Sequence, residues 1–103
     1  MMTAGDHALS GRWTVAPEYV QSAAPGASLV LRYYAGGANL VMATADGKPI
    51  DVKVQVDNRP PTTVRVGASD LYSLVQDRTE GEHTLTLTPA APGLRAYAFT
   101  FGG

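Results

Sequence analysis

Cysteine is absent from this chain of 103 residues. Without a thiol, the chain can form no disulfide, no thiolate zinc site and no dithiol redox centre. The absence leaves the compartment open, because a cysteine-free domain is stable on either side of a membrane. The chain also lacks any apolar run that approaches the length of a membrane-spanning helix. We therefore expect neither redox chemistry nor membrane insertion from this chain itself.

Charge of one sign is equally scarce. The chain has 8 Lys and Arg against 9 Asp and Glu, a formal net charge of −1, and its arginines are scattered singly. Nucleic acids and anionic membranes are bound by clustered cations, which release counterions and steer the encounter. A surface without clustered cations would bind nucleic acids and anionic membranes weakly, so we expect no nucleic-acid partner.

Residues 1–9 show no periodicity and are expected to be a disordered lead-in or a cloning remnant, with the folded domain at residues 10–103. The first ten residues, M-M-T-A-G-D-H-A-L-S, have no basic start and no long apolar segment. They are therefore not a signal peptide. The chain is then either cytoplasmic or a module cut from a longer protein.

Period-two alternation is the pattern that this sequence does contain. Leucines alternate with threonines over residues 84–88, and aromatic residues alternate with small ones over residues 96–101. Strict alternation over short runs predicts half-buried strands, so the chain should end inside a sheet with Tyr97, Phe99 and Phe101 in the core. The other expected strands or extended pieces are 10–16, 18–21, 28–34, 39–44, 51–57, 62–66 and 69–76.

Turn residues separate these segments. Gly36 and Gly37 predict a turn, residues 77–82 a charged loop, and Asn58 a residue with positive φ in the turn after the valine-rich strand. The resulting total of about eight strands has the spacing of a sandwich or barrel, and no segment of helical length has helical periodicity. We expect an all-β fold, a jelly-roll β-sandwich of antiparallel strands, with a closed barrel as the alternative.

Several segments together resemble one family. They are S-G-R-W at 10–13, L-V-L-R-Y-Y-A at 29–35, V-Q-V-D-N-R-P at 54–60, L-Y-S-L-V at 71–75 and G-E-H-T-L-T-L with A-Y-A-F-T-F-G over 81–102. In this order they resemble the C-terminal domain of DipZ-type proteins, which are bacterial membrane-anchored proteins of the thioredoxin family. The resemblance spans nearly the whole chain.

The resemblance implies a jelly roll of the galactose-binding-like or carbohydrate-binding-module-like type. It implies an extracytoplasmic, non-catalytic accessory module without a cofactor, beside a thioredoxin-like domain. A glycan or cell-wall carbohydrate is then the expected ligand. Because this chain has no C-x-x-C, redox activity does not carry over to it.

A sugar site needs exposed aromatic rings to stack on a pyranose and planar polar groups to bond its hydroxyls. Tyr33 and Tyr34 are adjacent, so a strand places them on opposite faces. Tyr33 continues a leucine face and is expected in the core, whereas Tyr34 shares a face with Arg32. Tyr34 and Arg32 are therefore the first candidates, with Trp13 as a second aromatic. The structural alternatives are a surface tyrosine under an arginine stem and a tryptophan packed at the core edge.

Asp57, Asn58 and Arg59 form a polar cluster at an expected loop tip, where ligand-binding residues tend to lie. Simple turn chemistry accounts for the Asp and Asn as well. His83 is expected to be a hydrogen-bonded structural residue, because no second His or acidic residue stands at ligand spacing. Scattered aspartates leave a structural calcium open, although no loop has the spacing of a calcium site.

Three functions remain open from the sequence. The first is a glycan-binding accessory module, and the second is a structural or protein-interaction domain that keeps the same shape without a sugar. The third, a small standalone hydrolase, lacks a Ser-His-Asp order, a paired-carboxylate motif and a phosphate loop.

Overall fold

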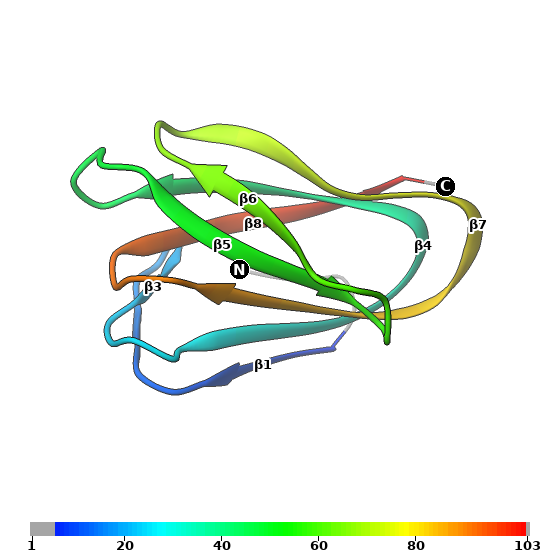
Figure 1. The fold of residues 1–103 in the computed structure, drawn as a ribbon, viewed down its shortest axis with the longest axis horizontal. Helices are drawn as coiled ribbons and strands as arrows, with labels where there is room; N and C mark the ends of the chain where they lie inside the picture. The colour runs from blue at the N-terminus through cyan, green and yellow to red at the C-terminus, as the bar shows by residue number, and fades with distance from the viewer. Residues whose placement is uncertain (1–5, 103) are drawn as a thin grey trace.

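The computed structural model describes residues 6–102, without the side chains of residues 6–7, 35, 76–80 and 100–102. Every regular element in this part of the chain is a strand (Figure 1). The strands are β1 Asp6–Ser10, β2 Trp13–Val15, β3 Val20–Ser22, β4 Ser28–Thr44, β5 Ile50–Val56, β6 Thr62–Val66, β7 Asp70–Pro89 and β8 Leu94–Gly102. Among these residues there is no helix of the length and apolarity needed to cross a membrane.

Two long strands, β4 and β7, belong to both layers of the fold. They contain 17 and 20 residues, and their mutual pairing is interrupted between Ala35 and Gly37, where both strands curve (Figure 1). Before this bend, β4 pairs with β1 and with the second half of β7. After it, β4 pairs with the first half of β7 and with β8.

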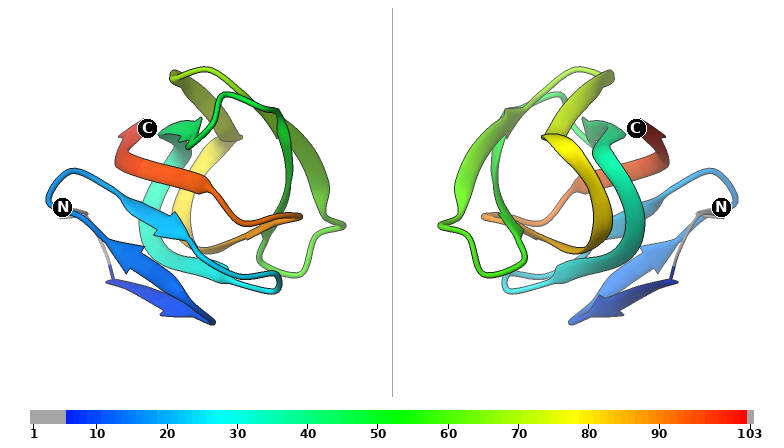
Figure 2. Two further views of the ribbon diagram at one scale, coloured as in Figure 1. Left: turned by 90° about the vertical axis from the view of Figure 1, so that its left-hand side faces the viewer. Right: turned by 90° about the vertical axis from the view of Figure 1, so that its right-hand side faces the viewer.

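The bend divides the strands into two antiparallel sheets of five strands each. Sheet 1 has the order β1-β4-β7-β5-β6, and sheet 2 has the order β2-β3-β8-β4-β7. Figure 2 shows β5 and β6 on one side of the molecule and β2, β3 and β8 on the other. The strand path ends at β2 and β6 without closing, so the chain forms the expected sandwich and not the barrel.

The turn expected at Gly36 and Gly37 and the loop expected over residues 77–82 are both wrong. Both segments lie inside continuous strands, at the bend where β4 and β7 pass from one sheet to the other. Glycine serves a tight strand bend as well as a chain reversal, because both need a backbone free of bulky side chains. These residues therefore do mark a change of backbone direction, but each strand continues through the bend.

The expected disordered lead-in is also wrong from residue 6 onward. Asp6–Ser10 forms β1, which pairs residue by residue with the first half of β4. Leu9 packs against the core. This edge strand does not alternate in hydrophobicity, which explains why periodicity missed it. Residues 1–5 lie outside the described residues.

The core lies between the two sheets and is built from the alternate residues of each strand. Tyr33, which is 4% exposed, lies in it as expected. Sheet 1 contributes Leu29, Leu31, Tyr33, Val52, Val54, Val56, Leu85 and Leu87, and sheet 2 contributes Val20, Ala38, Leu40, Met42, Val75, Leu94 and Ala96. The predicted inward faces of the strands at residues 28–34, 51–57 and 84–88 are thus confirmed.

The aromatic row of β8 differs from expectation because a β-bulge interrupts the strand. Leu40 pairs with Phe99 and Met42 pairs with Ala96, so Tyr97 and Ala98 share the place opposite a single β4 residue. An extra residue reverses which face the following side chains occupy. The bulge therefore puts Phe99 on the same face as Ala96, which lies in the core at 1% exposure, while Tyr97 is half-buried on the outer side of sheet 2. Phe99 packs against the core, and the side chain of Phe101 lies outside the described residues.

Candidate ligand-binding site

Five of the six candidate residues lie at one end of sheet 1, which we call the turn end: Arg32, Tyr34, Asp57, Asn58 and Arg59. Arg32 pairs with Thr84 across β4 and β7. Thr84 is bonded in turn to Asp57, whose N–H donates to the Thr84 carbonyl at 2.8 Å. Arg32, Thr84 and Asp57 thus form one row across three strands, and strand spacing puts its ends roughly 10 Å apart.

Tyr34 and Arg32 lie on the outer face of sheet 1. Tyr34 is 71% exposed, one of the most open large side chains described. Arg32 and Glu82, the cross-strand partner of Tyr34, are exposed as well. A ring this open leaves a π-face available for stacking, with charged groups on either side of it.

Asp57 is held by the chain on two sides. Its carboxylate accepts the Thr84 N–H at 2.8 Å and pairs with Nδ1 of His83 at 2.7 Å. The positive φ of the turn, 53°, falls on Asp57 rather than on Asn58 as expected. Aspartate tolerates this conformation because its side chain bonds the nearby backbone. Asp57 therefore fixes the start of the turn that presents Asn58 and Arg59.

The hydrogen bond from His83, with that from Thr84, lowers the pKa of Asp57 below its ordinary value. An ionised carboxylate only accepts hydrogen bonds, so Nδ1 of His83 carries the shared proton. The His83 ring also lies 5.6 Å from the Tyr33 ring, centroid to centroid. His83 is thus the hydrogen-bonded structural residue that the sequence led us to expect.

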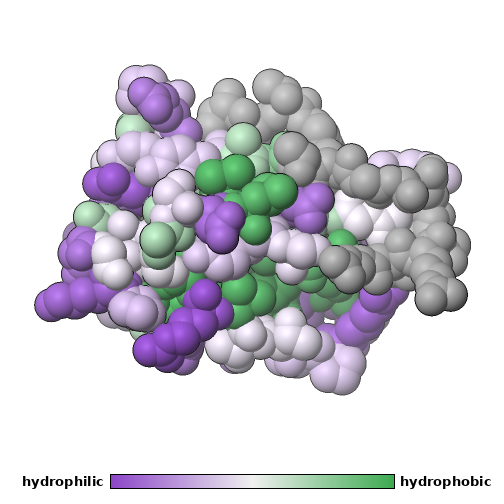
Figure 3. All heavy atoms as spheres, turned by 90° about the horizontal axis from the view of Figure 1, so that it is seen from above, coloured by the Kyte–Doolittle hydropathy of each residue, from purple (hydrophilic) through white to green (hydrophobic). Residues whose placement is uncertain are grey.

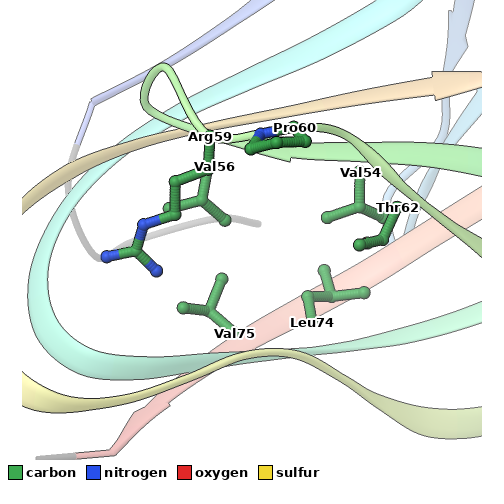
Figure 4. Close-up of a pocket in the computed structure, with 7 residues that line it drawn as sticks. All are labelled: Val54, Val56, Arg59, Pro60, Thr62, Leu74 and Val75. Carbon is green, nitrogen blue, oxygen red and sulfur yellow. The ribbon is translucent and has the colours of Figure 1, made fainter.

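A pocket of about 170 Å³ opens beside the turn, between β5 and the first half of β7 (Figure 4). Its walls are apolar, and Arg59 stands at its rim. The lining residues are Val54, Val56, Arg59, Pro60, Thr62, Leu74 and Val75. The Arg59 N–H donates to the Val56 carbonyl at 3.0 Å, and the Gln55 amide donates to the Arg59 carbonyl at 3.2 Å. The arginine is thereby anchored through its backbone above an apolar hollow.

Trp13 lies apart from the other candidates, on β2 in sheet 2. Its ring is half-buried against the core, and its indole N–H donates to the Ser10 carbonyl at 2.9 Å. The structure does not bring Trp13 together with the turn end.

Sequence reasoning missed a second group on the outer face of sheet 2, which we call the tyrosine–arginine cluster: Tyr19, Gln21, Arg95 and Tyr97. The Arg95 guanidinium lies 4.6 Å from the centroid of the Tyr19 ring. The Tyr19 and Tyr97 centroids are 5.3 Å apart, with the rings tilted by 54°. The Arg95 Nε–H donates to Oε1 of Gln21 at 2.9 Å. No sequence pattern predicted this cluster, because it depends on the pairing of β3 with β8 and on the interrupted pairing of β8 with β4.

Within the described part of the chain, no three His, Cys, Asp or Glu side chains gather where they could hold a metal ion.

Comparison with known protein families shows which family this chain belongs to. Residues 2–102 match the thioredoxin-like C-terminal domain family. The chain belongs to this family. This is the type of family that the sequence resemblance led us to expect. The comparison with curated protein sequences found no match.

Solved structures show the same sandwich inside larger enzymes. A family two carbohydrate esterase from Cellvibrio japonicus is similar with a TM-score of 0.85 and 21% identity, over 97% of this chain and 32% of the esterase. A family two carbohydrate esterase from Clostridium thermocellum is similar with a TM-score of 0.79 and 24% identity, over 94% of this chain and 31% of the esterase. The chain spans about a third of each esterase. At these identities the likeness shows the fold alone, which is carbohydrate-binding-module-like.

Proposed function

We propose that this thioredoxin-like C-terminal domain is a non-catalytic, glycan-binding accessory module of an extracytoplasmic, DipZ-like protein. The observation that carries the proposal is the open ring of Tyr34, 71% exposed, beside Arg32 at the turn end. In this role the module holds its parent protein, with the adjacent thioredoxin-like domain, near cell-wall carbohydrate or an exported glycosylated target.

The turn end has the chemistry that a pyranose needs. The Tyr34 ring stacks on the C–H face of the sugar, and Arg32 donates hydrogen bonds to its hydroxyls. Asn58 and Arg59 extend the contact across the sheet. The hydrogen bonds that Asp57 accepts from Thr84 and His83 fix this turn before any ligand arrives, which reduces the entropy lost on binding.

The fold supports the same function. The Clostridium thermocellum esterase that shares this sandwich was solved in complex with cellohexaose. A β-sandwich that accompanies carbohydrate chemistry in one protein is a suitable scaffold for carbohydrate binding in another, with the specific contacts supplied by each chain's own surface.

The test is calorimetric titration of the domain with cellohexaose and a panel of neutral oligosaccharides. We expect Tyr34→Ala to weaken binding by about tenfold or more, and Tyr34→Phe, which keeps the ring, to retain it. Leu71→Ala is the matched control, because Leu71 is an exposed apolar residue on the other sheet. Binding that survives Tyr34→Ala would discard this site while keeping the module.

A second candidate is a structural or protein-interaction domain without a sugar ligand. It is favoured by the outer face of sheet 1, where strands β5, β6 and β7 present polar side chains. These are Lys53, Gln55, Thr63, Thr84, Thr86 and Thr88. Absence of binding to every glycan in the panel, together with binding to a separately produced thioredoxin-like domain, would select this function.

A further inference from the structure

The tyrosine–arginine cluster is a locked arrangement on sheet 2. Gln21 and Arg95 are cross-strand partners between β3 and β8, so their side chains emerge on the same face. Alternation along β8 places Tyr97 on the same face as Arg95, within ring contact of Tyr19. Both rings are half-buried, which provides a shallow platform rather than a protruding anchor.

The polar groups of this platform are hydrogen-bond donors. An arginine carries five N–H groups, of which Gln21 accepts one. No described side chain bonds the two terminal nitrogens of Arg95, and no described carboxylate forms an ion pair with it. Oε1 of Gln21 is engaged by Arg95, which leaves the amide N–H groups of Gln21 to face a ligand. The cluster thus combines ring faces, fixed donors and one positive charge.

We propose that the cluster binds a carboxylate-bearing pyranose, such as a uronic acid residue of an acidic polysaccharide. The inference rests on the proposed glycan-binding function, but it assigns a second site on the opposite sheet and a different class of sugar. The planar guanidinium of Arg95 donates to the two oxygens of the carboxylate, and the tyrosine rings support the sugar ring. Arg95 keeps its orientation through Tyr19 and Gln21, so little rotamer freedom is lost on binding.

A carboxylated sugar fits these groups better than a protein surface does. Protein interfaces also use tyrosine and arginine as anchors, but these lie within a larger patch whose centre is apolar. The exposed large hydrophobic residues described here are Val15, Tyr34 and Leu71, and neither tyrosine of the cluster is among them. Figure 3, which views the molecule from above, shows apolar atoms gathered in the middle of the face that the first half of β7 crosses. A protein partner would therefore be expected to use that region instead.

The test compares binding of trigalacturonate with binding of its methyl ester, which keeps the rings and loses the charge. We expect the ester to bind about tenfold more weakly or worse, since each charge-assisted bond to Arg95 is lost or weakened. Arg95→Met and Tyr97→Ala are expected to weaken trigalacturonate binding by a similar factor. Arg95→Lys is expected to recover only part of it, because lysine lacks the planar fork.

Arg65→Met is the matched control, because Arg65 is an exposed arginine on the outer face of sheet 1, paired with Asp51 at 3.4 Å. It should leave binding unchanged. Equal losses for Arg65→Met and Arg95→Met would show unspecific attraction and overturn the inference, as would equal affinity for the acid and its ester. If Arg95→Met does not fold, Arg95→Lys and the ester comparison decide.

Different outcomes test the two proposed sites separately. Loss of cellohexaose binding in Tyr34→Ala with trigalacturonate binding intact supports the inference. Trigalacturonate binding that disappears in Tyr34→Ala but survives in Arg95→Met would overturn it and leave the turn end as the glycan site. Binding of a thioredoxin-like domain that requires Arg95, without binding of trigalacturonate, would overturn it in favour of a protein contact.

Discussion

Nδ1 of His83 lies 2.7 Å from Oδ2 of Asp57, and this contact ties β7 to the first residue after β5. Because Asp57 also adopts a positive φ and accepts the Thr84 N–H, one side chain ends a strand, starts a turn and joins two strands of sheet 1. The turn carries two of the proposed ligand contacts. Mutation of Asp57 therefore tests how strongly this side chain stabilises the turn.

Replacement of Asp57 should destabilise the domain. Asp57→Ala leaves the Thr84 N–H and His83 Nδ1 without their acceptor and puts alanine at a positive φ, at a cost of about 1–3 kcal/mol in the free energy of unfolding. Asp57→Asn keeps one acceptor and tolerates the backbone conformation, so it should cost less. Denaturant unfolding of both variants measures the difference, and equal costs would show that the retained acceptor and the backbone conformation contribute nothing.

The contribution of Asp57 should depend on pH. The hydrogen bond from His83 lowers its folded-state pKa below the ordinary value of 3.8. A lowered pKa means that the stabilisation is fully present above the unfolded-state value and is lost as the pH falls through the folded-state value. The stability gap between wild type and Asp57→Asn should therefore be larger at neutral pH and shrink below about pH 4. Denaturant unfolding from pH 7 to pH 3 checks this, and a gap that widened on acidification would contradict the assignment.

Gly11 should be less replaceable than Gly26, although both have nearly the same backbone conformation. Their φ angles are +83° and +82°, so alanine is strained at both positions. At Gly11 the new Cβ would also lie 2.9 Å from Cα of Ala27, whereas at Gly26 nothing lies within 4 Å. We expect about 1 kcal/mol of destabilisation for Gly26→Ala and at least 1 kcal/mol more for Gly11→Ala. Thermal unfolding of the two variants side by side tests the order.

Ser22 should be a sensitive polar position. Its hydroxyl is fully buried and accepts the N–H of Leu94 at 3.0 Å, which joins β3 to the start of β8. Ser22→Ala leaves that buried N–H without a partner and should cost about 1–3 kcal/mol. Ser69→Ala, at an exposed position, is the control and should lie within about 0.5 kcal/mol of wild type. Similar unfolding free energies for both variants would show that the Ser22 hydroxyl has no structural role.

The layers of this fold could be predicted because each core strand alternates. Leu29, Leu31 and Tyr33 face inward and Tyr34 faces outward, as period two requires. Alternation is a local property, so it survives even when the ends of the strand are misplaced. For the same reason, the sequence indicated the exposed ring of Tyr34 and the buried ring of Tyr33 without knowledge of any partner strand.

Properties that depend on pairing could not be predicted in this way. A single β-bulge in β8 puts Phe99 on the same face as Ala96, so Tyr97 lies outside the expected core row. The residues of the tyrosine–arginine cluster come from strands more than 70 positions apart, as the separation of 74 between Gln21 and Arg95 shows. The contact between Asp57 and His83 spans 26 positions. Each of these needs the sheet order, which alternation alone does not contain.

The passage of β4 and β7 through both sheets has a consequence for how such a domain diversifies. Neither wall of the sandwich belongs to a contiguous segment of the chain, so recombination cannot exchange one wall and keep the other. New specificities must arise by replacement of outward-facing side chains, or by insertion at connections such as the turn at Gly47, which joins β4 to β5 and lies outside the shared ladder. The two proposed ligand surfaces, the turn end and the tyrosine–arginine cluster, would thus be inherited together, while the residues of each change independently.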